Sequence, residues 1–195
     1  MAITNGYITL ANFKAVKTIS STDATDDGVI ERMIEQASRY IDIQTGRTFY
    51  ARTETHYFDV PGGRELRMDD DLLTITTLTN GDDNTIADTE YNLVPKNTTP
   101  YYAIRLKQMS SKYWDSDSDG NTEDVISVAG TWGYSDGAPM DVQQACEDIA
   151  MRMYGRRYGK GNDGQVKVTA AGVVVTPNDV SSQTQRVINY YKRRL

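Results

Sequence analysis

The hydrophobic positions of this chain follow two different spacings, and the change between them divides the sequence into three segments. In residues 1–50 apolar side chains recur every three or four residues, which is typical of amphipathic helices. In residues 51–135 they alternate with polar neighbours, which is typical of strands with one buried face. The helical spacing returns in residues 136–195. The pattern therefore predicts two helical segments on either side of a β insertion.

Two helices are expected in the first segment. Thr9 is suited to cap a short helix that runs to Lys17, because its hydroxyl can accept a hydrogen bond from a first-turn amide. A longer helix begins near Asp26 and Asp27 and ends at Gly46, which adopts the left-handed C-terminal cap at little cost. The apolar face of that helix consists of Ile30, Met33, Ile34, Ala37 and Ile41.

The middle segment has the two-residue spacing of a small antiparallel sheet, for which we expect roughly five to seven strands. The alternation is clearest in Leu73–Thr79, Tyr102–Leu106 and Ile126–Tyr134. Asn80-Gly81 follows the first of these runs and is a strong turn signal, because both residues tolerate the left-handed backbone of tight hairpins.

The third segment returns to helices. Pro139 suits the first turn of a helix, where the amide that proline lacks would have no partner. Gln165–Thr169 and Val173–Thr176 predict a β-hairpin, and Asp179 is a candidate N-cap for the last helix. The apolar faces of the two helices are Val142, Ala145, Cys146, Ile149, Ala150 and Met153, and then Val187, Ile188 and Tyr191.

These elements place the chain in the α+β class. We expect a helical core of about four helices, an inserted small antiparallel β-sheet, and a C-terminal β-hairpin followed by a helix. Residues 1–50 and 136–195 are expected to form one compact helical unit, and residues 51–135 an acidic β insertion. The chain has 195 residues, 38% apolar and 25% charged, which is ordinary for a globular protein of this kind.

Composition removes several classes of function. Cys146 is the only cysteine and His56 the only histidine, which excludes an intramolecular disulfide and the common zinc sites. The longest apolar run, residues 170–175, is far shorter than the roughly 20 residues that cross a bilayer. Residues 1–6 lack the basic and apolar segments of a signal peptide. We therefore expect no membrane partner.

Charge is distributed unevenly along the chain, whose net charge is −6. Residues 51–135 hold 7 basic and 15 acidic side chains, whereas residues 136–195 hold 9 basic and 6 acidic ones. Electrostatic repulsion of nucleic acid is therefore concentrated in the insertion, and the C-terminal third is mildly basic.

Six short motifs stand at helix starts, caps and turns along the chain. In order they are Tyr7–Leu10, Ile34–Asp42, Thr45–Tyr50, Tyr57–Leu66, Gly130–Tyr134 and Ala138–Val142. Their order and spacing resemble the head–tail connector family of tailed bacteriophages, the adaptor (head completion) proteins that dock beneath the portal. The resemblance covers roughly residues 7–158 and leaves out residues 159–195.

This resemblance implies a structural protein and no enzyme, with no cofactor. It implies a ring, usually a dodecamer, that lies beneath the portal, joins capsid to tail and surrounds the DNA channel. The implied partners are the portal protein, a downstream tail or stopper protein, and DNA that passes through the lumen without sequence recognition. The implied location is the neck of the virion, after synthesis in the host cytoplasm.

Two groups of residues near the C-terminus are candidates for the contacts of such a ring. We expect the last helix to dock on the portal or another partner, because its apolar stripe is followed by a run of cations. The alternative is that the helix packs on its own subunit. The docking residues are Val187, Ile188, Tyr190, Tyr191, Lys192, Arg193 and Arg194. The second group consists of Arg152, Arg156, Arg157 and Lys160. These residues either face DNA phosphates in the channel or are solvent-exposed charges that complement a helix dipole.

A second class of function is suggested by the loop that contains Asp115, Asp117 and Asp119. These residues occupy positions 1, 3 and 5 of an EF-hand calcium loop, and Gly120 occupies position 6. Position 12, which needs a bidentate glutamate, is Ile126. The loop is therefore either an acidic surface turn or a weak cation site. The alternative function is a calcium- or ligand-binding β-module with helical flanks.

Three further features are interpreted as structural. His56 lies in a strand pattern and has no second histidine nearby, so we expect a structural or exposed role. Asp69–Asp71 is either a divalent-ion site or, as we expect, a solvated turn before Leu72. Cys146 lies on the apolar face of its helix, which predicts a buried, inert thiol.

Overall fold

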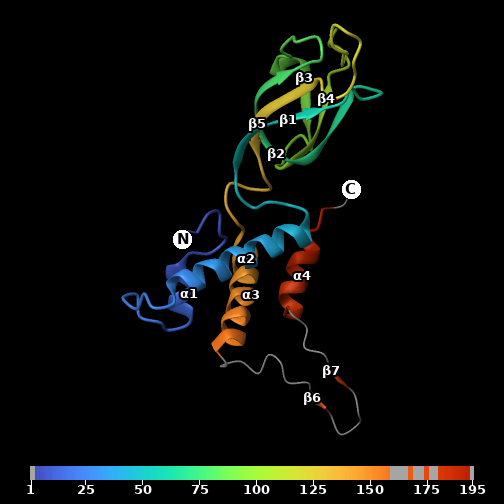
Figure 1. The fold of residues 1–195 in the computed structure, drawn as a ribbon. Coiled ribbons are helices and arrows are strands. Elements are labelled where there is room, and N and C mark those ends of the chain that lie inside the picture. Colours follow the sequence, from blue (N-terminus) through green and yellow to red (C-terminus); the bar gives the residue numbers. More distant parts are fainter. Residues whose placement is uncertain (1–2, 159–166, 169–173, 176–179, 194–195) are drawn as a thin grey trace. The chain divides into compact units, whose positions relative to one another are not determined.

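The computed structural model describes residues 3–158, 167–168, 174–175 and 180–193. The chain forms two compact units, a helical unit of residues 1–46 and 138–195 and a β unit of residues 47–137. Over the described residues, the helical unit holds four α-helices and the β unit a five-stranded antiparallel sheet (Figure 1). The predicted α+β class is confirmed.

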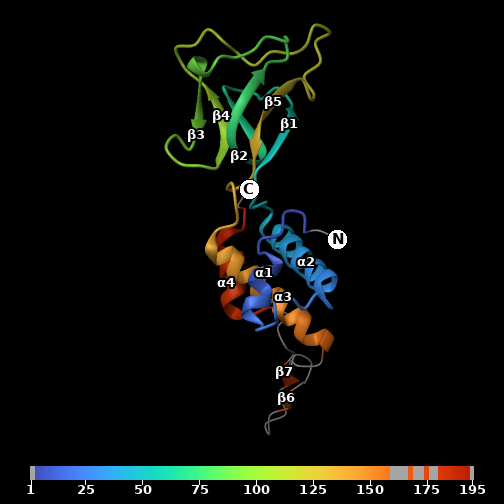
Figure 2. The ribbon, with the colours of Figure 1, turned by 90° about the vertical axis from the view of Figure 1, so that its left-hand side faces the viewer.

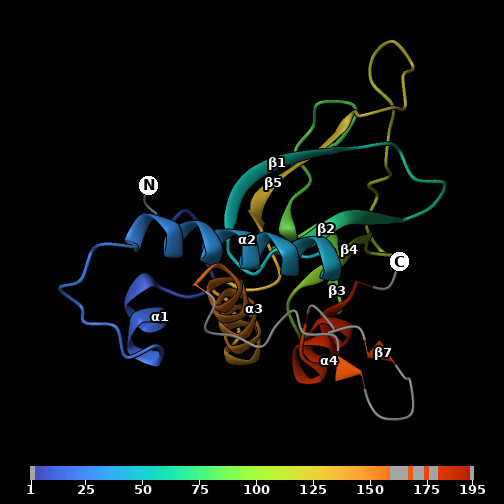
Figure 3. The ribbon, with the colours of Figure 1, turned by 60° about the horizontal axis from the view of Figure 1, so that its bottom comes forward.

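The helices of the helical unit are α1 (Leu10–Val16), α2 (Asp27–Thr45), α3 (Met140–Tyr158) and α4 (Ser182–Tyr191). α2 contacts the other three helices and crosses α3 (Figure 3). α1 begins after Thr9 as predicted, and the Thr9 hydroxyl oxygen accepts a hydrogen bond from the amide of Asn12 at 3.1 Å. α2 ends as predicted at Gly46, with a φ of +66°.

The core of the helical unit is built from the apolar faces of α2 and α3. The five α2 positions expected in the core are all 8% exposed or less. Val142, Cys146 and Ala150 of α3 are fully buried, and Ile188 adds a contribution from α4. Each large aliphatic side chain buried in this way stabilises the unit by about 1.5–3 kcal/mol. None of the described helices has the length and apolar character needed to cross a membrane.

α4 is joined to α3 by a chain of hydrogen bonds that begins at the α4 N-cap. The cap is Ser181, whose hydroxyl oxygen accepts from the amide of Thr184 at 3.1 Å, so the prediction of Asp179 as the cap is wrong. Serine and aspartate cap helices equally well, so the sequence did not distinguish them. The Ser181 hydroxyl donates to Thr184 Oγ1 at 2.9 Å, and Thr184 donates to Asp148 Oδ2 at 2.7 Å. Asp179 itself lies outside the described residues.

The strands of the β unit are β1 (Arg52–Phe58), β2 (Glu65–Thr79), β3 (Tyr91–Val94), β4 (Tyr101–Leu106) and β5 (Ile126–Trp132), with a 3-10 turn η1 (Asp88–Glu90) before β3. They are arranged in the order β1-β5-β2-β4-β3 (Figure 2), which confirms the expected antiparallel sheet. The first part of β2 pairs with β4 and the last part with β5. Leu72 marks the change of partner, since it lies opposite both Tyr101 and Trp132.

β5 is the strand on which the core of the β unit depends. Its side chains are buried in strict alternation, and Trp132 is fully buried. Gly130 is required where β5 passes closest to β2, because a Cβ atom at this position would lie 2.1 Å from the main-chain oxygen of Thr74. The alternation ends at Trp132, two residues earlier than the sequence pattern indicated.

Two short strands occur between α3 and α4. β6 (Lys167–Val168) and β7 (Val174–Val175) pair antiparallel, with Lys167 opposite Val175. This pairing agrees with the predicted hairpin. The other residues of the predicted hairpin lie outside the described residues.

We predict that the Cys146 thiol is unreactive in the folded protein. It is fully buried, and burial raises its pKa to about 11, so very little thiolate exists at pH 8. The native protein should show no reaction with a chromogenic disulfide reagent at pH 8, and one thiol per chain should react after denaturation. Rapid labelling of the native protein would contradict the packing of α2 against α3.

We also predict that the attachment of α4 is sensitive to acid. Burial alone would raise the pKa of Asp148, but hydrogen bonds from Thr184 and Ser181 and the charge of Arg152 lower it overall. The stabilisation is therefore fully present above the unfolded-state pKa of about 3.9 and is lost as the pH falls through the lower folded-state value.

Thermal melting followed by helical circular dichroism tests this expectation. Asp148→Asn should lower the melting temperature most at neutral pH, and its difference from the wild type should shrink progressively as the pH falls below about 3.9. Glu147→Gln on the same helix is the matched control, since the Glu147 carboxylate accepts its hydrogen bond from the exposed side chain of Gln144 at 3.2 Å. A pH-independent effect of Asp148→Asn would contradict the linkage.

Candidate functional site

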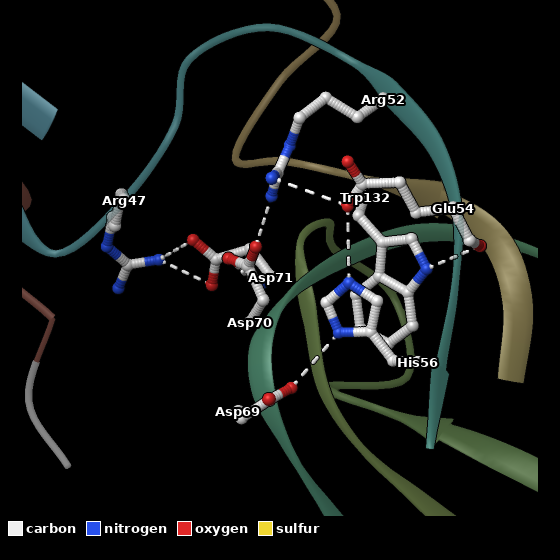
Figure 4. Close-up of polar contacts among 8 residues, drawn as sticks. All are labelled: Arg47, Arg52, Glu54, His56, Asp69, Asp70, Asp71 and Trp132. Atoms are coloured by element: carbon white, nitrogen blue, oxygen red, sulfur yellow. Dashed lines mark hydrogen bonds and ion pairs between the residues drawn. The ribbon is translucent and has the colours of Figure 1, made fainter. Parts of the chain in front are cut away.

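The β unit contains a network of charged side chains around three consecutive aspartates of β2 (Figure 4). Asp69, Asp70 and Asp71 lie in the irregular stretch between the pairing of β2 with β4 and its pairing with β5. Their basic partners lie between residues 47 and 56 and are, in the same order, His56, Arg52 and Arg47. The network therefore links β2 to the segment that opens the unit.

Asp71 is the buried member of this network, with only 3% of its surface exposed. Nη1 of Arg47 donates to both carboxylate oxygens of Asp71, at 2.7 and 2.6 Å. The Arg47 guanidinium also lies over the ring of Tyr134, 5.1 Å from the ring centroid. A buried carboxylate costs free energy unless it is paired and hydrogen-bonded. The two hydrogen bonds from Arg47 therefore offset the cost of burying this carboxylate.

The two segments that connect the β unit to the rest of the chain are both fixed beside Asp71. The amide of Gly133 donates to the main-chain oxygen of Asp71 at 2.8 Å, and the amide of Tyr134 donates to that of Thr48 at 2.8 Å. The rings of Tyr134 and the fully buried Phe49 are in contact, with centroids 5.4 Å apart. The opening and closing segments of the β unit are thus held to each other and to β2.

His56 has a structural role in the same network. Its ring stacks on that of Trp132, with centroids 3.9 Å apart and planes inclined by 10°. Its two ring nitrogens lie 3.2 Å from Asp69 Oδ1 and 3.3 Å from Glu54 Oε2. The indole nitrogen of Trp132 donates to the main-chain oxygen of Glu54 at 3.1 Å. His56 therefore covers the central tryptophan while its nitrogens contact carboxylates.

The expectation of a solvated turn at Asp69–Asp71 is wrong, because the run lies inside β2 and Asp71 is buried. A carboxylate is normally a sign of exposure, so the pattern of polar positions gave no indication of this burial. The partner that makes it possible, Arg47, is 24 residues away. Among the described residues, no group of three or more His, Cys, Asp or Glu side chains is arranged to hold a metal ion.

The aspartate-rich loop before β5 forms a turn that is stabilised from within. Asp117 Oδ1 accepts hydrogen bonds from the amides of Asp119 and Asn121, at 2.9 and 2.8 Å. One carboxylate oxygen of the calcium-like motif is thus used to hold the backbone. Asp115 and Asp119 are exposed. This geometry agrees with an acidic surface turn, and weak cation binding at the loop stays a prediction.

The candidate DNA-facing arginines lie in the last turns of α3. Arg152 Nε lies 3.3 Å from Asp148 Oδ1, and Arg157 lies over the ring of Tyr158. Arg156 is exposed, and Lys160 lies outside the described residues. Cations at this end of a helix complement its dipole whether or not DNA is near. Their role in a DNA channel stays a prediction.

α4 packs on its own unit. Ile188 is 2% exposed, and the Tyr191 hydroxyl donates to Asp141 of α3 at 3.1 Å. The amide of Arg193 donates to the main-chain oxygen of Thr45 at 2.7 Å. Ile188 therefore belongs to the core of its own unit, contrary to the expectation that it docks on a partner, whereas Val187 and Tyr191 are only half-buried.

The remaining docking candidates are distributed around the end of α4. Tyr190 is 78% exposed and Lys192 is exposed, while Val187 is half-buried. Arg194 lies outside the described residues. Partner docking through Tyr190 and Lys192 stays a prediction.

We predict that removing the charge of Asp71 destabilises the β unit selectively. Asp71→Asn leaves the Arg47 guanidinium without its counter-charge, and breaking a buried ion pair in this way typically costs about 3 kcal/mol. Both tryptophans of the chain, Trp114 and Trp132, lie in the β unit, so tryptophan fluorescence follows its unfolding alone. The midpoint should fall by roughly 12–24 °C for a unit of this size.

The matched control is Asp69→Asn, whose side chain is 72% exposed. This change should alter the free energy of unfolding by less than about 0.5 kcal/mol. Equal effects of the two substitutions would show that burial of Asp71 does not matter to the stability of the unit.

The sequence matches no protein-family model and no curated protein. Solved structures with the same fold are found among the chains of gene transfer agent (GTA) particles. A chain from the "Neck of empty GTA particle computed with C6 symmetry" has a TM-score of 0.61 and 16% identity, over 100% of this chain and 95% of that chain.

Two further structures give the same result. A chain from the "Neck of native GTA particle computed with C12 symmetry" has a TM-score of 0.55 and 16% identity, over 100% of this chain and 94% of that one. A chain from the "Virion of native gene transfer agent (GTA) particle" has a TM-score of 0.57 and 16% identity, over 100% and 95%. This chain therefore has the fold of chains found in the neck of a gene transfer agent particle, which is consistent with the head–tail connector resemblance.

Proposed function

We propose that this protein is a structural head–tail connector subunit in the neck of a phage-like particle. The observation that carries the proposal is the likeness to neck chains over 100% of this sequence and 94–95% of theirs. A match that includes helices, insertion and connections in one chain is stronger support than a shared sheet or helix pair. Because fold alone does not fix function, the agreement with the separate sequence motifs is the second support.

The chemistry of the described residues is in keeping with a role without catalysis. The one histidine is stacked on Trp132, and the one cysteine is a buried thiol with a raised pKa. The conspicuous carboxylates are either paired with arginines, as Asp70 and Asp71 are, or bound to backbone amides, as Asp117 is. These contacts stabilise the folded structure.

In the proposed assembly, copies of the chain form a closed ring, with twelve the number that the C12 neck reconstruction favours. The ring lies beneath the portal, joins capsid to tail and surrounds the DNA channel. The portal binds one side, a tail or stopper protein binds the other, and DNA passes through without sequence recognition. The proposed location is the virion neck, after synthesis in the host cytoplasm.

Electron microscopy of the purified full chain, alone and mixed with the portal of the same particle, tests the proposal. We expect rings that stack on the portal in projection and co-sediment with it. A portal from an unrelated phage is the control and should give no stacked complex. A chain that stays monomeric and never associates with its portal would refute the connector role.

A further inference from the structure

The surface of the helical unit carries a shallow groove made of two adjoining hollows that share Tyr40. The larger hollow, of about 520 Å³, lies along α2 alone, and the smaller, of about 170 Å³, lies between α2, α3 and Val180. The apolar side chains that line it, besides Val180, are Tyr40, Ile43, Ile149 and Met153. Its charged lining residues are Arg32, Arg39, Arg152 and Arg156, with Glu35 as the one carboxylate. We call these residues the α2–α3 groove.

The chemistry of the groove is that of a protein-binding surface. Ile43 is 79% exposed, so its aliphatic side chain is available for contact with another chain. Arginine is the cation most enriched at interfaces, because its planar group binds carboxylates and also packs against apolar surface. An apolar floor with an arginine rim is complementary to an acidic segment that carries an aromatic or apolar anchor.

The chain itself carries a segment of this chemistry, residues 113–124 before β5. The segment holds five carboxylates and no cation, and it begins with Tyr113, which is 62% exposed. Tyrosine is a frequent interface anchor, because it buries a large ring with little loss of conformational entropy. The carboxylates of the segment are Asp115, Asp117, Asp119, Glu123 and Asp124.

The acidic segment is already held in a defined shape before any partner binds. Arg64 donates to the main-chain oxygens of Lys107, Ser110 and Lys112, at 2.6, 3.1 and 3.1 Å, and its guanidinium lies over the Tyr113 ring. Asp117 fixes the following turn. A loop ordered in this way loses little conformational entropy when it binds, which favours affinity.

The charges of the two units complement each other between copies. The β unit holds 8 basic and 16 acidic residues, for a net charge of −8, and the helical unit holds 13 and 11, for +2. Contact between the β units of two copies is therefore repulsive, whereas contact of a β unit with another copy's helical unit is attractive.

We infer that the α2–α3 groove of one copy receives residues 113–124 of a second copy. Such a head-to-tail contact uses two different surfaces and is the kind that closes into a ring. The inference rests on the proposed connector function, since it names the contact by which neighbouring subunits of the ring bind. It also gives a role to the aspartate-rich motif, which holds no metal-ligand cluster among the described residues.

A charge-reversal experiment on the full chain tests the contact. Arg32→Glu with Arg156→Glu alters the groove at exposed positions, and Asp119→Lys with Glu123→Lys alters the segment. The matched control is Arg186→Glu, which reverses an exposed charge of the same helical unit outside the groove. Self-association is measured by sedimentation velocity over a concentration series at low salt, and circular dichroism checks that each variant is folded.

We expect each altered pair to weaken self-association at least tenfold and the control to leave it unchanged. The chain carrying both altered pairs should recover association, because the signs again match. If the groove variant fails to associate and the combined variant does not regain association, the groove binds something other than residues 113–124. If the wild type and the groove variant associate equally, the inferred contact is wrong, but the proposed ring is not contradicted. A wild-type chain that never associates with itself overturns the inference, and association with the portal then decides the connector function separately.

Discussion

The arrangement of the β unit depends on one buried ion pair, between Arg47 and Asp71. Removing Asp71 from water is unfavourable, and the two hydrogen bonds from Arg47 are what offset that cost. Arg47 is the first residue of the unit, and the main chain of Asp71 binds Gly133 near its end. Asp71 therefore contacts the opening segment through its carboxylate and the closing segment through its main-chain oxygen, next to the point where β2 changes partner.

The helical unit holds its distant segments together by apolar contact and not by a buried ion pair. Its first and last thirds are separated by 91 residues of insertion, and they are rejoined by apolar contact between α2 and α3. Cys146 illustrates the consequence, since a thiol buried at this junction, 3.4 Å from Ser38 Oγ, is unsuited to reactivity. α4 is then added by polar contacts through Thr184 and by the burial of Ile188. Burial of apolar side chains holds these distant segments together, and hydrogen bonds fix the position of α4 on α3.

Charged residues in this protein serve shape and association. Within each unit, arginines hold carboxylates or carbonyl oxygens that would otherwise be strained or unsatisfied, as Arg64 does for the start of the long loop before β5. The β unit carries an excess of acidic residues and the helical unit an excess of basic ones, so every copy has two surfaces of unlike charge. Subunits with unlike, complementary sides are what a cyclic assembly requires. This division of charge is a property that the proposed ring can use directly.

The sequence by itself determined the order of elements, the α+β class and most helix ends. Those features depend on local physics: the period of apolar residues, the hydroxyl of Thr9 and the missing side chain of Gly46 act over a few residues. Only the tertiary structure decided that Asp71 is buried, that Ser181 caps α4 and that Ile188 belongs to the subunit's own core. Each of these depends on a partner far away in the chain: Arg47 for Asp71, Asp148 for the Ser181–Thr184 pair, and α3 for Ile188. The spacing of apolar and polar residues along the chain gives no information about these partners, because the free energy of such contacts arises only when distant segments pack together.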